Sequence, residues 1–400
     1  MDKKNKVKLL IILRLFTGLE KSLIKKKWEP TGVPTIYKFL EKIDKVFHCR
    51  IIFITFGDNE LNVSNYNKKI NIDGLNSDIY LFNNNILKKN IISKIFIYLY
   101  TLLKIFKHHY NFKPNIIYLN NHNIIFASLL KKILKVKIVL RIMGVYEPMR
   151  SIYIKNSFKN YVMKKLYNSN FDLSILTQDG SGVESWSKKA LTKTRNIKIL
   201  INGVDQFNYS KTYKNSKFNK ILFFGRLEVG KGILEFIDFA VRINAMFPNS
   251  YEFLVIGTGE YEDFMITSFK KESLKYIHFK RVSHNKINQI INKSDIYISL
   301  NKRGGLSNTN LEVFKSGIFS IILKSDKSKY IDLYTDKLIP KDIVPRISRK
   351  RPVEDLISLF KEKSLRKNII SKSKKLKKIM IDVNNWNDRI NNEINLIKKL

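Results

Sequence analysis

The sequence predicts an α/β protein of two doubly wound domains, each with a parallel sheet covered by helices. The chain has 400 residues, whereas a single hydrophobic core stops growing at roughly 250–300 residues. Hydrophobic residues make up 44% and charged residues 27% of the chain, as in globular proteins and unlike disordered or fibrous ones. Short apolar runs alternate with helical patterns along both halves, which indicates parallel sheets buried on both faces.

In the first half, the apolar run 9–13 resembles the hydrophobic part of a signal peptide. It stops at Arg14 without a small-residue cleavage site, so we expect a buried strand over 8–14 instead. Helical spacing is found over 37–43 and 124–134. Further strands of the buried type are predicted at 50–55, 115–119, 137–140, 173–176 and 197–201.

The second half repeats this rhythm, with its clearest helices over 232–247 and 284–292. The turn dipeptide Asn202-Gly203, before the polar stretch 206–220, marks the domain boundary. Since ligands bind at the carboxyl ends of strands in doubly wound sheets, we expect a central cleft that both domains face. The strands of this half are predicted at 221–224, 253–256, 276–279, 296–300 and 319–323.

The segment 90–109 has one narrow polar stripe and a very wide apolar face. A basic amphipathic helix of this kind can lie in a membrane interface. The width of the apolar face favours a helix that covers a sheet, and this is our interpretation, with membrane attachment as the alternative. The stripe consists of Ser93, Lys94, Thr101, Lys104 and His108.

The chain is strongly basic, with 74 Lys and Arg against 34 Asp and Glu and a formal net charge of +40. Such a surface attracts phosphates, anionic lipid headgroups and nucleic acid. However, Lys outnumbers Arg by 60 to 14, the charge is diffuse, and no aromatic RNA-stacking motif or reading helix is found. We therefore predict no specific nucleic-acid partner and interpret most of the charge as solvated surface.

Cys49 is the only cysteine, which excludes an intramolecular disulfide and a cysteine metal cluster and fits a reducing cytosol. No stretch reaches the ~18 consecutive apolar residues of a membrane helix. We expect a cytoplasmic protein, with possible peripheral contact to the anionic inner face of a membrane.

Two cations follow the first strand of the second half. This strand ends in Gly225-Arg226, a short glycine-containing loop follows, and Lys231-Gly232 opens a helix. Arg226 and Lys231 could clamp a diphosphate, since Arg offers a planar fork and Lys a point charge. The alternative is two ordinary surface cations.

A second loop of the same kind follows the predicted strand 296–300. It contains Gly304 and Gly305, and Ser307 is a candidate helix cap. Free backbone N–H groups at such a helix start form a natural phosphate site. Glu312, one turn into the helix, could accept hydrogen bonds from ribose hydroxyls or merely complement the helix dipole.

These motifs together resemble family 4 glycosyltransferases, over most of the chain. Each motif is short, but five of them occur in the order and spacing of that family. They are Asn202-Gly203-Val204-Asp205, Gly225-Arg226-Leu227 with Lys231-Gly232, Val255-Ile256-Gly257-Thr258-Gly259-Glu260, Gly305-Leu306-Ser307-Asn308 with Leu311-Glu312, and Trp386 with Arg389.

The resemblance implies the GT-B fold and retaining transfer of a sugar from a nucleotide-diphosphate sugar to a glycan or lipid-linked acceptor, as in polysaccharide or lipopolysaccharide biosynthesis. Arg226 and Lys231 would be catalytic and stabilise the leaving diphosphate. No cofactor and no obligatory metal are implied, and the sequence has no Asp-x-Asp metal motif. The implied donor-binding residues are Gly225, Gly257, Gly304, Gly305, Asn308, Thr309 and Glu312.

The resemblance also implies an acceptor-binding domain over 1–202, a donor-binding domain over 203–375, and a C-terminal helix over 376–400 that packs back on the first domain. Gly32, His122 and Gly144 are the candidates on the acceptor side. The loop 177–182 follows another strand, but no role can be assigned to it.

Two positions depart from the family pattern. Gly304 replaces a glutamate that contacts the donor sugar, and Met143 replaces the histidine of a His-Gly pair. These departures support an alternative function, a non-catalytic glycosyltransferase-like subunit that binds a nucleotide or a partner.

Overall fold

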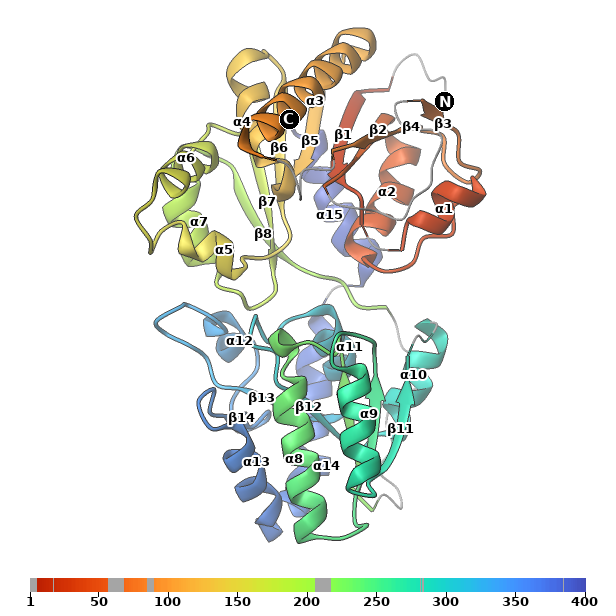
Figure 1. Ribbon diagram of the computed structural model, residues 1–400, viewed down its shortest axis with the longest axis vertical. Helices are drawn as coiled ribbons and strands as arrows, with labels where there is room; N and C mark the ends of the chain where they lie inside the picture. The colour runs from red at the N-terminus through yellow and green to blue at the C-terminus, as the bar shows by residue number, and fades with distance from the viewer. Residues whose placement is uncertain are drawn as a thin grey trace. The chain divides into compact units, whose positions relative to one another are not determined.

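The computed structural model describes residues 6–16, 18–56, 68–84, 90–205, 217–280, 282, 284–383 and 385–400. They form two compact units (Figure 1). Unit 1 comprises Met1–Thr177, Trp186–Leu200 and Trp386–Leu400, and unit 2 comprises Gln178–Ser185 and Ile201–Asn385. The chain first enters unit 2 over Gln178–Ser185 and returns to it at Ile201, two residues before the predicted boundary. Most of the polar stretch predicted at that boundary, 206–216, lies outside the described residues.

Unit 1 contains an eight-stranded sheet in the order β3-β4-β2-β1-β5-β6-β7-β8. At its centre, β1 (Lys8–Arg14) pairs in parallel with both β2 and β5. Five consecutive residues of β1 are buried, as expected for a strand covered on both faces. The other strands are β2 (His48–Thr55), β3 (Lys69–Ile70), β4 (Asp78–Asn83), β5 (Ile116–Asn120), β6 (Lys137–Ile142), β7 (Leu173–Gln178) and β8 (Ile197–Ile201).

Helices cover both faces of this sheet. On one face, α2 (Pro34–Val46) and α15 (Trp386–Lys398) pack against each other and into the main core of the unit. On the other, α3 (Ile91–Phe112) contacts α4 (Ile124–Ile133) through Tyr98 and Phe126, and α4 contacts α6 (Phe158–Tyr167). The remaining helices of this part of the chain are α1 (Glu20–Lys25), η2 (Asn121–Asn123), α5 (Glu147–Ser151) and α7 (Val183–Ala190).

Unit 2 contains a six-stranded sheet in the order β11-β10-β9-β12-β13-β14, and each pair of neighbouring strands is parallel. The strands are β9 (Lys220–Phe224), β10 (Glu252–Ile256), β11 (Lys275–Phe279), β12 (Ile296–Ser299), β13 (Phe319–Leu323) and β14 (Arg346–Ile347). The helices are η3 (Val229–Lys231), α8 (Ile233–Met246), α9 (Glu262–Lys271), α10 (His284–Lys293), α11 (Asn308–Ser316), α12 (Leu333–Leu338), α13 (Pro352–Lys361), α14 (Lys363–Ile379) and η4 (Met380–Asp382).

The predicted architecture of two doubly wound α/β domains is confirmed, and all eleven predicted strands are present. Three strands were not predicted. β3 and β14 have two residues each, too few for a hydrophobic pattern. In β4 an aspartate and an asparagine flank only four apolar residues, and Tyr80 among them is half-buried.

The interpretation of segment 90–109 as a helix buried by the sheet is wrong in one respect. A helix is present, but among its described residues α3 buries only Thr101, Leu102, Ile105 and Phe112. Ile97, Tyr98 and Phe106 are half-buried, and the other apolar residues of its wide apolar face are exposed. Periodicity gave the width of the apolar face but not the part of it that the sheet covers.

A buried ion cluster fixes α15 in unit 1. The carboxylate of Glu393 lies 3.2 Å from Arg141 and 2.7 Å from Arg389, and it accepts a hydrogen bond from the Tyr118 hydroxyl at 2.6 Å. Burial alone would raise the pKa of Glu393, but the two guanidinium groups hold it below its ordinary value. Arg141 also donates to the hydroxyl of Thr177 and so joins β6, β7 and α15.

We predict that Glu393→Gln destabilises unit 1 by about 3–5 kcal/mol, because it leaves two buried guanidinium groups without their carboxylate. All three tryptophans, Trp28, Trp186 and Trp386, belong to unit 1, so tryptophan fluorescence during urea unfolding reports on this unit alone. Asp73→Asn, which removes an exposed carboxylate in unit 1, is the control. Equal urea midpoints for both variants would contradict the structural role of the cluster.

Candidate functional site

The candidate site lies at the carboxyl edge of the unit 2 sheet, where β9 and β12 are neighbours. The chain proceeds from β9 outward to β10, and from β12 outward in the opposite direction to β13. This arrangement is a topological switch point, the place where doubly wound sheets bind ligands. The loops after these two strands contain the predicted donor-binding residues Gly225, Gly304 and Gly305, and Asn308, Thr309 and Glu312 lie on α11, which follows the second loop.

The loop after β9 places two cations at this edge. Gly225 follows the strand in an extended conformation with φ 158°, and the next side chain, Arg226, is exposed. Lys231 ends the short helix η3 and is half-buried. Its burial, together with the positive charges of Arg303 and Arg226, lowers the pKa of Lys231 to about 8, although Glu228 and Asp179 oppose this shift.

Arg303 is a third cation of this cluster, and the sequence analysis missed it. Its guanidinium pairs with Glu228 of the neighbouring loop at 3.0 Å, and the adjacent Lys302 N–H donates to the carbonyl of Gly230 at 3.0 Å. The loops after β9 and β12 are therefore tied together. The sequence contained one sign of this role, since Arg303 directly precedes the Gly304-Gly305 pair. In a chain with so many cations, that position alone did not distinguish it.

The start of α11 faces the same cavity as Lys231. Ser307 caps this helix and accepts from the Asn310 N–H at 3.4 Å. Lys231, Ser299, Asn301, Ser307 and Asn310 are among the residues that line a small cavity there. Positive charge and a helix N-terminus thus adjoin one space, which is the arrangement that binds phosphate.

The other residues predicted on α11 differ in their surroundings. Asn308 accepts a hydrogen bond from the amide of Asn202 at 2.6 Å, so two of the sequence motifs are in direct contact. Thr309 follows it in the first turn and is half-buried. Glu312 is only 6% exposed.

Gly257, another predicted donor-binding residue, has a packing reason to be glycine. It follows β10 with φ 136°, and a Cβ there would overlap the carbonyl oxygen of Gly225. The two strand ends can approach each other only because this side chain is absent. A contact of Gly257 with a ligand stays a prediction.

The loop 177–182, to which the sequence gave no role, packs against the Gly304-Gly305 loop. Gln178–Ser185 belongs to unit 2, and the carbonyl of Asp179 accepts from the Leu306 N–H at 3.1 Å. A Cβ on Gly304 would overlap that carbonyl. The space beside Gly304 is therefore filled by backbone.

This packing brings a new carboxylate to the site. The side chain of Asp179 accepts hydrogen bonds from the N–H and hydroxyl of Ser181, and it acts electrostatically on Lys231. Burial raises the pKa of Asp179 to about 6, although the bonds from Ser181 oppose this. The nearby charge of Asp332 also raises it, as a smaller contribution.

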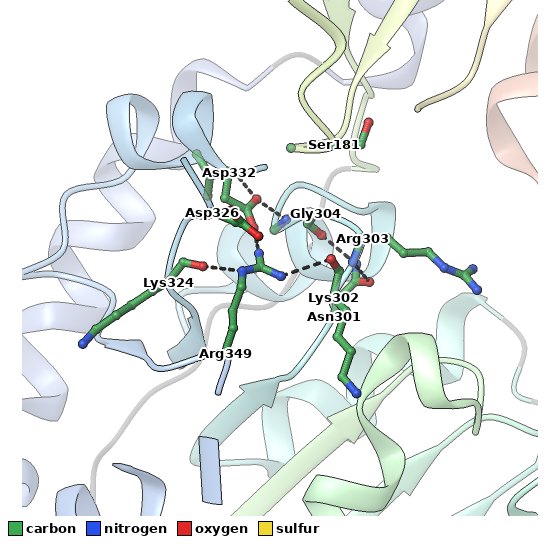
Figure 2. Close-up of polar contacts among 12 residues, drawn as sticks. Ser181, Asn301, Lys302, Arg303, Gly304, Lys324, Asp326, Asp332 and Arg349 are labelled. Carbon is green, nitrogen blue, oxygen red and sulfur yellow. Dashed lines mark hydrogen bonds and ion pairs between the residues drawn. The ribbon is translucent and has the colours of Figure 1, made fainter. Parts of the chain in front are cut away.

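Behind the site, Asp332 and Arg349 join several loops (Figure 2). The Asp332 carboxylate accepts from the Gly305 N–H, from the Thr335 hydroxyl at 2.8 Å and from Arg349 at 2.7 Å. Arg349 also donates to the carbonyls of Lys324 and Lys302, at 2.6 and 3.1 Å. The N–H of Gly305 is thus used internally, contrary to the expectation that it is free for phosphate.

The three acceptor-side candidates lie near the carboxyl ends of adjacent strands of unit 1. Gly32, with φ 95°, follows a residue whose N–H donates to Gly18, just beyond β1. His122 is exposed and lies in η2, the short helix that directly follows β5, and Gly144, with φ 129°, lies just beyond β6. The order β1-β5-β6 in the sheet places them along one edge, while their contact with an acceptor stays a prediction.

Comparison with known proteins adds a family match for unit 2. Residues 204–376 match the family model of "Glycosyl transferases group 1". No curated protein gives a significant match to the chain. The matched region includes every predicted catalytic and donor-binding residue.

Solved structures match the whole chain at low sequence identity. Sucrose-phosphate synthase from Thermosynechococcus elongatus is 12% identical with a TM-score of 0.68, over 98% of this chain and 99% of that one. HepE of Anabaena, in complex with UDP and glucose, is 13% identical with a TM-score of 0.63, over 98% and 100%. WaaG, a glycosyltransferase involved in lipopolysaccharide biosynthesis, is 12% identical with a TM-score of 0.60, over 98% and 99%. These matches confirm the predicted GT-B fold, with two Rossmann-like domains.

We predict that Gly304→Glu, which restores the residue expected from the family pattern, damages the site instead of improving it. Its Cβ would have to displace the backbone of Asp179 and Gly180. The control is Lys302→Ala in the same loop, whose side chain is 42% exposed and forms an ion pair with Glu235. We expect a thermal midpoint several degrees lower for Gly304→Glu alone. If the thermal midpoint of Gly304→Glu equals that of the parent, the backbone around position 304 can shift without loss of stability, and the prediction is wrong.

Proposed function

Given a group 1 glycosyl transferase segment in unit 2 and the GT-B fold of the chain, we propose that the protein is a retaining glycosyltransferase of the family 4 type. It transfers a sugar, as a hexosyltransferase does, from a nucleotide-diphosphate sugar to a glycan or lipid-linked acceptor. Assembly of a surface polysaccharide or lipopolysaccharide at the cytoplasmic side of a membrane is the proposed setting.

The observation that supports this function most directly is the cation cluster at the β9–β12 switch point. Arg226, Lys231 and Arg303 lie in two loops that are tied together at the carboxyl edge of one sheet. The pKa of Lys231 is lowered mainly by burial, and the positive charges of Arg303 and Arg226 contribute to the same shift. A dianionic diphosphate would relieve that repulsion, so the cluster is suited to such a ligand.

In the proposed reaction, the bond between the anomeric carbon and the diphosphate oxygen breaks, and the diphosphate keeps the electron pair. Arg226 and Lys231 stabilise the negative charge that develops on it, which is where catalysis gains most from fixed charges. The acceptor hydroxyl bonds to the anomeric carbon on the same face, and its proton passes to an oxygen of the leaving phosphate. No step needs a metal.

Two carboxylates complete the proposed donor site. Glu312 holds the ribose hydroxyls of the nucleotide. Asp179 faces the sugar in place of the glutamate that Gly304 replaces, and its pKa of about 6 leaves it largely ionised at neutral pH. Gly32, His122 and Gly144 form the proposed acceptor side.

The absence of a side chain at Gly304 also favours a second candidate, a non-catalytic subunit that binds a nucleotide or a partner. The two candidates differ in turnover. Release of nucleoside diphosphate from a nucleotide-sugar, dependent on acceptor, supports the enzyme. Nucleotide binding without such release, across UDP-, GDP- and ADP-sugars and a panel of glycan and lipid acceptors, supports the non-catalytic candidate.

We predict that one of UDP, GDP and ADP binds saturably in calorimetric titration and that Arg226→Ala and Lys231→Ala each weaken it at least tenfold. Each variant removes one charge-assisted contact to the diphosphate. Lys270→Ala, at an exposed position of α9, is the matched control and should bind like the parent. A chelator should change neither binding nor transfer.

The opposite pattern is equally clear. Weak binding of all three nucleotides, equal in the three variants and abolished by moderate salt, would reduce the cluster to ordinary surface charge. The proposed function would then be wrong.

We also predict that nucleotide affinity changes little between pH 7 and 8 and falls above pH 8, approaching tenfold per pH unit. The pKa of Lys231 is about 8 in the free protein, so the ammonium that binds the diphosphate is progressively lost above that pH. Lys231→Arg keeps its charge throughout and should give a flat profile between pH 7 and 9. The same decline in Lys231→Arg would assign the titration to another group.

A further inference from the structure

The helix α3 presents a continuous apolar surface to solvent. Its stripe residues are Ile92, Ile95, Phe96, Leu99 and Leu103, each between 50% and 67% exposed. At 100° per residue they fall within an arc of about 100°. The buried residues Thr101, Ile105 and Phe112 lie roughly 130–170° from the centre of this arc, whereas the buried Leu102 borders it beside Ile95. We call these five residues the α3 stripe.

Large apolar side chains that are exposed next to one another are uncommon on a soluble protein and indicate an interaction site. The α3 stripe extends over about three turns of the helix. The whole helix has 22 residues and is about 33 Å long. Tyr100 and Tyr110, at 60% and 77% exposure, extend the surface. Among the described residues, no helix is long and apolar enough to cross a bilayer.

Positive charge accompanies the stripe. Lys107 is exposed on the same helix, and the Lys104 ammonium lies 3.9 Å from the ring centre of Tyr100. Between Asp78 and Asp172 the sequence contains sixteen Lys and Arg residues and a single acidic residue, Glu147. The helices of this face, α3, α4 and α6, all come from that acid-poor region.

The neighbouring helices add exposed apolar side chains on the same face of the sheet. Ile133 at the end of α4 is 58% exposed, and Phe158 and Tyr161 of α6 are 83% and 57% exposed. Lys132 and Lys159, next to them in sequence, are exposed too. The combination of apolar and basic side chains therefore extends beyond a single helix.

We propose that the α3 stripe is a membrane-docking surface that inserts shallowly into a bilayer rich in anionic lipid. Apolar side chains enter the boundary between headgroups and acyl chains, while the lysines around them contact lipid phosphates. A second copy of the chain would fit the α3 stripe less well than a membrane does. A two-fold contact sets the same basic surface against itself, and like charges would then oppose association.

The test is co-sedimentation of the full chain with vesicles of phosphatidylcholine alone and of phosphatidylcholine with 30% phosphatidylglycerol. We expect binding to the anionic vesicles and at least tenfold weaker binding to the neutral ones. The double variant Phe96→Ser, Leu99→Ser should lose at least tenfold in affinity for anionic vesicles. Lys104→Gln with Lys107→Gln should lose several-fold and show a shallower salt dependence.

The matched control is Phe264→Ser with Ile277→Ser, which removes two exposed apolar side chains of unit 2 and should bind vesicles like the parent. Thermal unfolding followed by tryptophan fluorescence confirms that the stripe variant folds. Equal vesicle binding by parent and stripe variant would overturn the proposal, as would no binding by the parent. So would a dimeric parent in light scattering that the stripe variant converts to a monomer, because the occupant would then be a second copy.

This proposal goes beyond the proposed function and fails separately from it. Nucleotide binding is measured in solution without lipid and depends on unit 2, whereas vesicle binding depends on α3. A protein that binds vesicles but no nucleotide would refute only the function. One that binds nucleotide but no vesicles would refute only the docking surface.

Discussion

The candidate site depends on the buried carboxylate of Asp332. This one side chain accepts hydrogen bonds from the loop after β12, from α12 and from Arg349 beyond β14. The backbone N–H of Asp332 also donates to the carbonyl of Gly180. Burial raises the pKa of Asp332, while the Gly305 N–H and Arg349 oppose that shift. Irregular loops pay a high entropic cost when they become ordered, and a shared acceptor orders several of them at once.

With those loops fixed, the site can hold like charges close together. Arg226, Lys231 and Arg303 repel one another, and the repulsion is balanced by Glu228, Asp179 and the backbone that surrounds them. Binding of the proposed diphosphate at such a site would need little reorganisation, because the charges are already held in place. Burial, with a further contribution from Arg303 and Arg226, lowers the pKa of the half-buried Lys231 and so distinguishes it from the many exposed lysines of the chain.

The sequence predicted the parts of the structure that depend on local pattern. Buried strands such as β1 and β12 are continuous apolar runs, and Arg226, Lys231, Gly304 and Glu312 follow strand ends at recognisable spacing. The contacts of Asp179 with Leu306 and of Arg349 with Asp332 could not be predicted, because they join residues far apart in the chain. Likewise, the apolar face of α3 was visible in the sequence, whereas its exposure depends on how much of it the sheet can reach.

Unit 1 is discontinuous, since α15 joins it only after the whole of Ile201–Asn385 has passed through unit 2. The carboxylate of Glu393 is therefore the last component to reach Arg141 and Tyr118 during synthesis. A ribosome adds about 5–20 residues per second, so roughly ten seconds or more separate Leu200 from Trp386. During that interval the nascent first unit holds an unneutralised guanidinium group and an uncovered sheet face, while the second unit has its full sequence first. Unit 2 is therefore expected to finish folding before unit 1, although unit 1 begins first in the chain.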